Sequence, residues 1–257
     1  EAMLKYGSDK PDLRNPLVIQ DVSNIFEKID LKVFNGKIVR IISVPNGASQ
    51  PRTWFESMTD YAIKECKAKG LAWLKVGDDR SLQGPIAKFI DDKSREELLT
   101  STNTNAGDAI FFIAEHEPVV SKLGGQIRDE LGRTLGLIDD SVYKFCWIVD
   151  FPMYERVENG KIEFCHNPFS MPQGGMEALE TQEPLDILAY QYDIVGNGIE
   201  LASGAVRNHS PEIMIKAFEI AGYKEEVILK KFSALYNAFH YGAPPHAGVA
   251  PGIDRII

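Results

Sequence analysis

Apolar and polar positions in the first half of the chain change repeatedly from the period of a strand to the period of a helix. Short apolar runs that end at Gly or Pro turns are typical of buried strands, whereas apolar side chains three and four positions apart are typical of amphipathic helices. The pattern predicts strands at residues 37–44, 71–76 and 109–114 and helices at residues 54–66 and 118–137. We expect Gly70 to end the first helix, and Ser94 with Glu97 to form a capping box that opens a further short helix.

Strands dominate the second half of the chain. Residues 188–195 and 199–206 are two β-rich runs separated by Gly196-Asn197-Gly198, and Asn-Gly between apolar runs is a strong hairpin signal. The other predicted elements are strands at residues 145–151 and 162–164, a helix capped by Ser210 with Pro211 at its first position, and a helix at residues 224–240. Strands joined by a hairpin, with flanking helices, describe an antiparallel sheet covered by helices, which is an α+β architecture.

The chain ends in a segment with its own pattern. Residues 241–257 read YGAPPHAGVAPGIDRII and predict a loop, a short buried strand at residues 246–250, a glycine turn and the start of a helix. Arg255 lies in the first turn of that helix, beside backbone N–H groups that have no partner within the helix. Such a turn can bind an anion, for example a phosphate. A plain surface turn is the alternative, and the residues alone leave both interpretations open.

Composition limits the class of protein. With 257 residues, 44% of them hydrophobic, the chain can form one large domain or two smaller ones. No apolar run approaches the ~18 residues of a membrane span, and the first residues lack the pattern of a signal peptide. Cys66, Cys146 and Cys165 have no metal-binding spacing, which favours reduced thiols in a cytoplasmic protein. The net charge of −9 argues against nucleic-acid binding by bulk charge but does not exclude a local binding face.

The predicted hairpin contains the candidate residues whose chemical roles are most specific. Asp193 and Glu200 lie on its two strands, and because strand partners face each other at about 5 Å, the two carboxylates can share one face. Such a pair suits Mg²⁺ bound together with nucleotide phosphates, and two separate rim charges are the alternative. Arg207 follows the small residues 203–205, which would let a ligand approach the backbone, and a guanidinium binds a carboxylate in bidentate fashion. A surface arginine at a strand end is the alternative here.

The terminal segment resembles a motif of a known enzyme family. Residues 242–257 are similar to motif 3 of class II aminoacyl-tRNA synthetases of the bacterial aspartyl type. The resemblance implies that Arg255 holds the far end of ATP. It places further ATP-binding positions in the turn before it, at Gly252, Ile253 and Asp254. Pro251 departs from the family, in which an aromatic residue often stands at that position, so the shape of the nucleotide site is expected to differ slightly.

Two other segments resemble the same family. Residues 192–209, YDIVGNGIELASGAVRNH, are similar to its metal and amino-acid segment. This implies that Glu200 binds ATP and Mg²⁺, that Asp193 is its acidic companion, and that Arg207 clamps the side-chain carboxylate of aspartate.

The third segment surrounds His166. On its own, a lone histidine before Asn-Pro is most often a hydrogen-bonding loop residue. The segment CHNPFSMP resembles the family's His-His-Pro-Phe loop, whose first histidine contacts aspartate, and this implies an aspartate-binding role for His166. Asn167 replaces the second histidine and is a departure from the family.

The resemblance also divides the chain into domains. KYGSDKPDLR, residues 5–14, is similar to the segment that leaves the first catalytic half of the bacterial aspartyl enzymes. The resemblance implies a catalytic-domain connector at residues 1–16, an inserted α/β domain (the GAD domain) at residues 17–140, and the C-terminal half of a class II catalytic domain at residues 141–257. In composition, the connector also reads as a solvated linker.

The resemblance implies an aspartate–tRNA ligase that activates L-aspartate with ATP and Mg²⁺ to aspartyl-adenylate and transfers it to tRNA(Asp). Whether tRNA(Asn) is also charged stays open. We expect a homodimer without membrane association in the full-length enzyme. The chain lacks the anticodon-binding domain, motif 1 and motif 2, so we expect a fragment that is inactive alone. The alternatives are a non-catalytic tRNA-binding module built on the inserted domain, and an enzyme that forms an amide from aspartate and ATP, although the inserted block argues against the latter.

Overall fold

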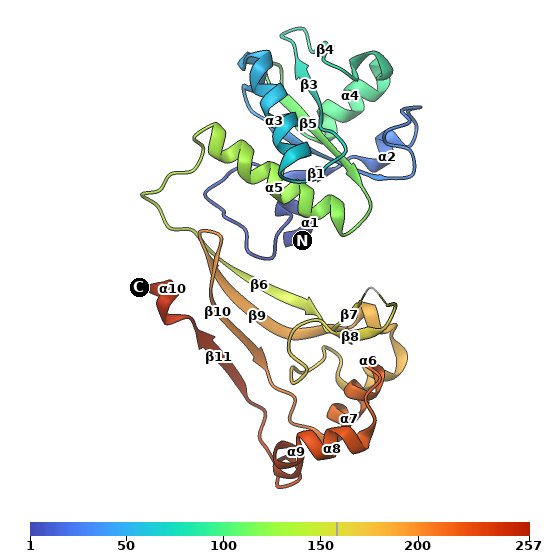
Figure 1. The fold of residues 1–257 in the computed structure, drawn as a ribbon, viewed down its shortest axis with the longest axis vertical. Helices are drawn as coiled ribbons and strands as arrows, with labels where there is room; N and C mark the ends of the chain where they lie inside the picture. Colours follow the sequence, from blue (N-terminus) through green and yellow to red (C-terminus); the bar gives the residue numbers. More distant parts are fainter. Residues whose placement is uncertain (158) are drawn as a thin grey trace. The chain divides into compact units, whose positions relative to one another are not determined.

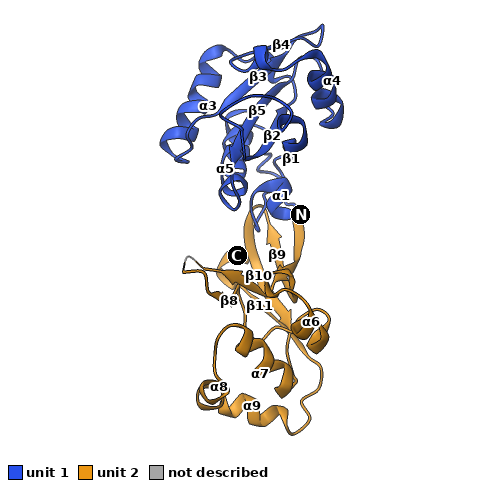
Figure 2. Cartoon of the chain, turned by 90° about the vertical axis from the view of Figure 1, so that its right-hand side faces the viewer, with its two compact units in different colours: residues 1–144 blue, residues 145–257 orange. Residues whose placement is uncertain are grey.

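The chain forms two compact units in a computed structural model that describes residues 1–157 and 159–257. Unit 1 comprises residues 1–144 and unit 2 comprises residues 145–257, as Figure 2 shows. The combination of antiparallel sheets and helices expected from the sequence is confirmed in both units.

Unit 1 is built on a five-stranded sheet in the order β1-β2-β5-β3-β4, with neighbouring strands antiparallel (Figure 1, with β2 labelled in Figure 2). Its strands are β1 Ile19–Asp21, β2 Ile38–Val44, β3 Ala72–Val76, β4 Leu82–Gln83 and β5 Ala109–Glu115. Its helices are α1 Ala2–Tyr6, α2 Ser23–Phe26, α3 Arg52–Lys64, α4 Asp92–Ser101 and α5 Val119–Thr134, with 3₁₀ turns at Gly47–Ser49 and Ala87–Phe89.

The core of unit 1 lies on both faces of this sheet. Along β5, Phe111 and Ile113 point into one apolar cluster, and Ile110 and Phe112 point into the other. The first cluster is covered by α3 and α5, and the second by α2 and α4 (Figure 1). A strand buried on both faces must be apolar at every position, which explains the unbroken apolar run seen in the sequence.

Two helix boundaries in unit 1 differ from the sequence prediction. Helix α3 ends at Lys64, and the left-handed residue that follows is Lys67, with φ 61°, rather than Gly70. Helix α4 is capped by Asp91, whose carboxylate accepts a 2.7 Å hydrogen bond from the Ser94 N–H. The predicted box at Ser94 is therefore wrong, because Asp91 is the N-cap and the helix begins three residues earlier than predicted.

The N-terminal segment is part of unit 1 and is not a solvated linker. Arg128 of α5 is 1% exposed, and its guanidinium donates to the backbone carbonyls of Asp12, Asn15 and Leu17 at 2.6–2.9 Å. The Asn15 side chain donates in return to the Arg128 carbonyl at 2.8 Å. Backbone carbonyls of a loop need partners when they are buried, and here a single side chain supplies three bonds.

Unit 2 contains a four-stranded antiparallel sheet in the order β11-β10-β9-β6 and a separate β7–β8 hairpin. Its strands are β6 Phe145–Pro152, β7 Tyr154–Arg156, β8 Ile162–Phe164, β9 Leu188–Gly196, β10 Ile199–Val206 and β11 Ala247–Pro251. Its helices are α6 Gly175–Thr181, α7 Pro211–Ile220, α8 Glu225–Lys231, α9 Ser233–Phe239 and α10 Ile253–Ile256, with a 3₁₀ turn at Pro184–Asp186.

The predicted hairpin is confirmed as β9 and β10. Asn197 and Gly198 have φ of 50° and 83°, and positive φ at both turn residues is what a tight Asn-Gly hairpin requires. Helix α7 begins as predicted, with the Ser210 hydroxyl accepting from the Ile213 N–H and Pro211 at the first position.

The single helix predicted at residues 224–240 is wrong, because the chain forms α8 and α9 with a break at Phe232. The Phe232 ring packs on Phe169 and Phe218, with centroids 5.1 and 5.7 Å apart. This packing outweighs the helical periodicity of the segment.

Strand β11 forms at residues 247–251, close to the prediction, but it is largely exposed instead of buried. Among the described residues it pairs only with β10, so it lies at the edge of this sheet. In the part of the chain that the structure describes, no helix has the length and apolar character needed to cross a bilayer.

Candidate functional site

The hairpin brings three of the predicted site residues to one face of the sheet of unit 2. Asp193 pairs with Ser203, and Glu200 pairs with Val195, two positions further along β9. Paired residues of antiparallel strands share a face, and alternate residues along one strand share it as well. Arg207 lies four residues after Ser203, so its side chain is on the same side of the sheet. Asp193, Glu200 and Arg207 therefore share one face, which we call the site face.

A β-bulge lies at the turn end of the site face. The register of β9 and β10 shifts between Glu200 and Ala202, so that Leu201 is the extra residue. A bulge re-aims the side chains beside it, and such features are over-represented next to active sites. The hairpin was predictable from the sequence, whereas the bulge left no signal there.

Arg255 contacts this bulge directly. Its Nη1 donates to the carbonyl of Glu200 at 2.9 Å and to Glu200 Oε1 at 3.2 Å. The pair is partly solvated, with side chains 53% and 25% exposed, so its net contribution to stability is small. The Arg255 Nε and Nη2 atoms have no hydrogen bond to the described residues. Two residues that lie 55 positions apart in sequence thus form one end of the candidate site.

The turn before α10 positions this arginine. The Gly252 N–H donates to the Leu201 carbonyl at 2.8 Å, which ties the turn to the bulge, and the Arg255 N–H donates back to Gly252 at 2.9 Å. Ile253 and Asp254 occupy the first positions of α10 and are exposed. The predicted order of strand, glycine turn and helix start is therefore present.

Arg207 occupies the other end of the site face. Its backbone N–H donates to the His246 carbonyl at 2.9 Å, and its guanidinium lies over Gly248 of β11, less than 4 Å from where a Cβ would stand. Beside it is a cavity of about 300 Å³ that Phe169, Leu235 and His246 help to line. The α9 residue Leu235 was not a candidate in the sequence, because only the tertiary fold brings it near Arg207.

Gly204, one of the small residues before Arg207, serves a different purpose from the one expected. A Cβ on Gly204 would stand 2.3 Å from the Gly248 carbonyl oxygen and 2.4 Å from the Tyr192 ring. The Tyr192 ring crosses β10 at Gly204, on the face opposite the site face, and its hydroxyl donates to the Gly248 carbonyl at 3.0 Å. The space at Gly204 is therefore filled by Tyr192, and only Ser203 and Ala205 face the candidate site.

His166 lies in an exposed loop that approaches the site face from the side of β6. Its ring packs edge-on against Phe151, with centroids 5.0 Å apart, and Phe151 pairs with Ala189 on the site face. The neighbouring Asn167 side chain is used within its own turn, because Asn167 Oδ1 accepts from the Phe169 N–H at 2.9 Å. The departure at Asn167 thus has a structural use in closing the loop.

Other groups on the site face limit its chemistry. Burial raises the pKa of the Cys146 thiol, which keeps it protonated at neutral pH and unsuited to act as a nucleophile. Asp193 is 7% exposed. Among residues 1–157 and 159–257, no cluster of three or more His, Cys, Asp or Glu side chains could hold a metal ion by itself. Asp193 and Glu200 can supply only the one or two carboxylates that Mg²⁺ uses when phosphates complete its shell.

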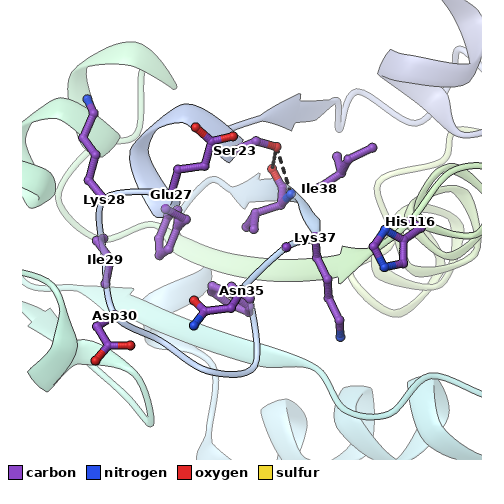
Figure 3. Close-up of a pocket in the computed structure, with 13 residues that line it drawn as sticks. Ser23, Glu27, Lys28, Ile29, Asp30, Asn35, Lys37, Ile38 and His116 are labelled. Carbon is purple, nitrogen blue, oxygen red and sulfur yellow. Dashed lines mark hydrogen bonds between the residues drawn. The ribbon is translucent and has the colours of Figure 1, made fainter.

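Unit 1 contains a separate cavity of about 720 Å³, drawn in Figure 3. Its labelled lining mixes both signs of charge, since Glu27 and Asp30 lie on the α2 side and Lys37 and His116 lie across from them. The Ser23 hydroxyl accepts from the Val39 N–H at 2.9 Å and is committed to the fold. No predicted site residue belongs to this cavity.

Comparisons with known proteins agree on one family. A family model described as tRNA synthetases class II (D, K and N) matches residues 1–257. The chain is 56% identical over 258 residues to the aspartate–tRNA ligase of Streptomyces coelicolor and 53% identical over 267 residues to the aspartate–tRNA(Asp/Asn) ligase of Rickettsia bellii. The matches cover all of this chain but 44% of each relative, so the chain spans less than half of their length.

Solved structures give a weaker likeness. An aspartyl-tRNA synthetase from Entamoeba histolytica is 18% identical with a TM-score of 0.31, and the match covers 86% of this chain and 39% of that one. A putative aspartyl-tRNA synthetase from Leishmania major Friedlin is 15% identical with a TM-score of 0.33, over 86% of this chain and 44% of that one.

Proposed function

The chain belongs to the class II tRNA synthetases (D, K and N), and on that premise we propose that it supplies part of the active site of an aspartate–tRNA ligase. The longer protein that contains it would join L-aspartate to ATP to form aspartyl-adenylate and pass the aspartyl group to tRNA. The observation that carries the proposal is the site face, where two carboxylates and one arginine share a side of the β9–β10 hairpin and a second arginine closes its end.

Each residue has a distinct task in this proposal. Arg207 would bind the side-chain carboxylate of aspartate through its planar fork, and His166 would contact the same substrate from the loop. Asp193 and Glu200 would hold Mg²⁺, which would neutralise charge on the phosphates of ATP. Arg255 would bind the far phosphate, with its turn formed by Gly252, Ile253 and Asp254.

The contact between Arg255 and Glu200 suits such a site. The bond to the Glu200 backbone carbonyl fixes the position of the guanidinium, while the bond to Oε1 is to a side chain that can rotate away. The unbonded Nε and Nη2 edge then presents two donors to a phosphate. Catalysis of this kind relies on holding the carboxylate in line with the reacting phosphate, so positioned donors matter more than a general base.

Two further properties belong to the proposal. The relative from Rickettsia bellii is named for both tRNA(Asp) and tRNA(Asn), and the relative from Streptomyces coelicolor is named without that specification. We propose tRNA(Asp) as the minimal partner, and charging of tRNA(Asn) is a question for aminoacylation assays with both tRNAs. Homodimer formation and a cytoplasmic location remain predictions of the family resemblance.

Substrate-specific kinetics test the assignment. In the longer protein, Arg207→Ala should raise the apparent KM for aspartate toward the upper end of a range of roughly 30- to 4,000-fold, and Arg207→Lys toward the lower end, because lysine keeps the charge and loses the fork. Neither should change the KM for ATP by more than about twofold. Arg255→Ala should do the reverse. ATP–pyrophosphate exchange with each substrate varied in turn measures both.

Arg156→Ala is the matched control, since that exposed arginine of unit 2 bonds only the Gly160 carbonyl at 3.3 Å among the described residues. It should leave both constants unchanged. A higher KM for ATP with an unchanged KM for aspartate in Arg207→Ala would show that the two roles are assigned wrongly.

A further inference from the structure

The His166 loop is joined by backbone hydrogen bonds to the end of the hairpin where β9 and β10 diverge. Strands β9 and β10 pair as far as Gln191 and Ala205, and beyond that rung a third segment enters between them. The Met171 N–H donates to the Val206 carbonyl at 2.9 Å, and the Tyr190 N–H donates to the Met171 carbonyl at 2.9 Å. The segment around Met171 is therefore wedged between the diverging ends of the hairpin.

Gln191 is the last residue of β9 that pairs with β10 before the Met171 segment enters between the two strands. It is 7% exposed, and it shares the site face with Asp193, two positions further along β9. Its side-chain Nε2 donates to the Asn167 backbone carbonyl at 3.3 Å. A buried amide is costly without hydrogen-bond partners, so this bond stabilises the contact between the strand and the Asn167 turn, in addition to the backbone bonds of the loop.

The turn that receives this bond is itself closed. The Asn167 carbonyl also accepts from the Ser170 N–H at 3.3 Å, and Asn167 Oδ1 accepts from the Phe169 N–H at 2.9 Å. His166 is the residue immediately before this closed turn. The bond from Gln191 is thus a side-chain connection between the strand that carries Asp193 and the loop that carries His166.

We propose that Gln191 is a positioning residue for the aspartate end of the site, because it holds the Asn167 turn, and with it His166, at a fixed place on the site face. The inference rests on the proposed function for its substrate and goes beyond it in assigning a task to Gln191. Gln191 does not touch substrate in this account. It sets the place of a residue that does, so its loss should weaken aspartate binding and spare ATP binding.

The first test needs no catalysis and uses the 257-residue chain. Gln191→Met keeps the length of the side chain and removes the donor. In a sample with labelled histidines, the His166 ring resonances, assigned with His166→Gln, should shift in Gln191→Met. The matched control is Gln173→Met, which removes another side-chain amide bond of unit 2, the 2.7 Å bond from Gln173 Nε2 to Asp150 Oδ1. Resonances of His166 that stay in place in Gln191→Met would overturn the inference.

The second test uses ATP–pyrophosphate exchange by the longer protein. Loss of one neutral hydrogen bond corresponds to about 2- to 12-fold in binding. Gln191→Met should raise the KM for aspartate within that range, with kcat and the KM for ATP changed less than twofold and with Gln173→Met unaffected. A rise of both KM values together, or a kcat loss alone, would mean a general structural role and would overturn the inference.

The two proposals fail in distinguishable ways. If the unaltered longer protein shows no aspartate-dependent exchange, the proposed function is wrong, and the role of Gln191 at an aspartate site falls with it, whatever the His166 resonances do. If exchange is normal and Gln191→Met leaves the KM for aspartate unchanged, only the inference about Gln191 is wrong.

Discussion

At the scale of single residues, Gly204 makes the sharpest prediction about stability. A Cβ there would meet the Gly248 carbonyl and the Tyr192 ring at 2.3 and 2.4 Å, and neither can retreat without breaking the bond between them. Gly204→Ala should lower the free energy of unfolding by about 2–3 kcal/mol, the cost of overpacking a fitted site. Urea unfolding of the chain, followed by tyrosine and tryptophan fluorescence, measures the change.

Gly70→Ala is the control for this substitution. A Cβ on Gly70 meets no atom within 4 Å, so the change should be neutral, or stabilising by up to about 1 kcal/mol through the unfolded chain. Equal effects of the two substitutions would refute the close approach at Gly204.

Individual residues also show which structural features the sequence predicts and which it does not. The shared face of Asp193 and Glu200 was predictable, because an Asn-Gly turn fixes the register of the hairpin. The use of Gly204 was not predictable, since its neighbour Tyr192 reaches it across the sheet. The tie from Gln191 to Asn167 was also invisible, because glutamine at a strand position has no local signature for a partner 24 residues away.

At the scale of elements, helix α5 and the N-terminal segment depend on each other through Arg128. Its three carbonyl partners are 111 to 116 residues away in sequence, which is why the segment read as a linker from composition. Arg128→Met should lower the free energy of unfolding of unit 1 by about 3 kcal/mol or more, because buried carbonyls lose their donors. Chemical denaturation of the chain tests this.

Arg133→Met, on the same helix, is the matched control. Arg133 is 69% exposed and pairs with Glu130 one turn away. Such surface pairs contribute little, so the substitution should change the free energy of unfolding by less than about 0.5 kcal/mol. If Arg128→Met were as mild as Arg133→Met, the N-terminal segment would not depend on Arg128.

At the scale of the whole molecule, the division into two units predicts how the chain can be cut. The buried residues of both apolar clusters of unit 1 lie within residues 17–131, so residues 1–144 should fold alone and unfold cooperatively. A piece that begins at residue 17 lacks the carbonyls of Asp12 and Asn15 and leaves Arg128 with one of its three backbone partners. We expect residues 17–144 to be less stable than residues 1–144 by about 2 kcal/mol or more.

Circular dichroism of the two pieces in urea measures the difference. Equal midpoints would show that the N-terminal segment adds nothing to the fold of unit 1. The sequence resemblance places the domain limits at residues 17–140 and 141–257, from motifs alone. Sequence motifs identify functional segments. The limits of a compact unit depend on tertiary contacts such as those of Arg128, which no local sequence pattern predicts.

Pro251 controls what can be added to the open side of the sheet in unit 2. It is the last residue of the edge strand β11, and the next N–H, that of Gly252, is bonded to Leu201 of β10. Backbone amides alternate in direction along a strand, so the amide of residue 251 would face outward, and proline has no hydrogen there to donate. A strand from elsewhere that extends this sheet therefore loses its partner at Pro251. The Gly252 turn that carries Arg255 begins immediately after this position.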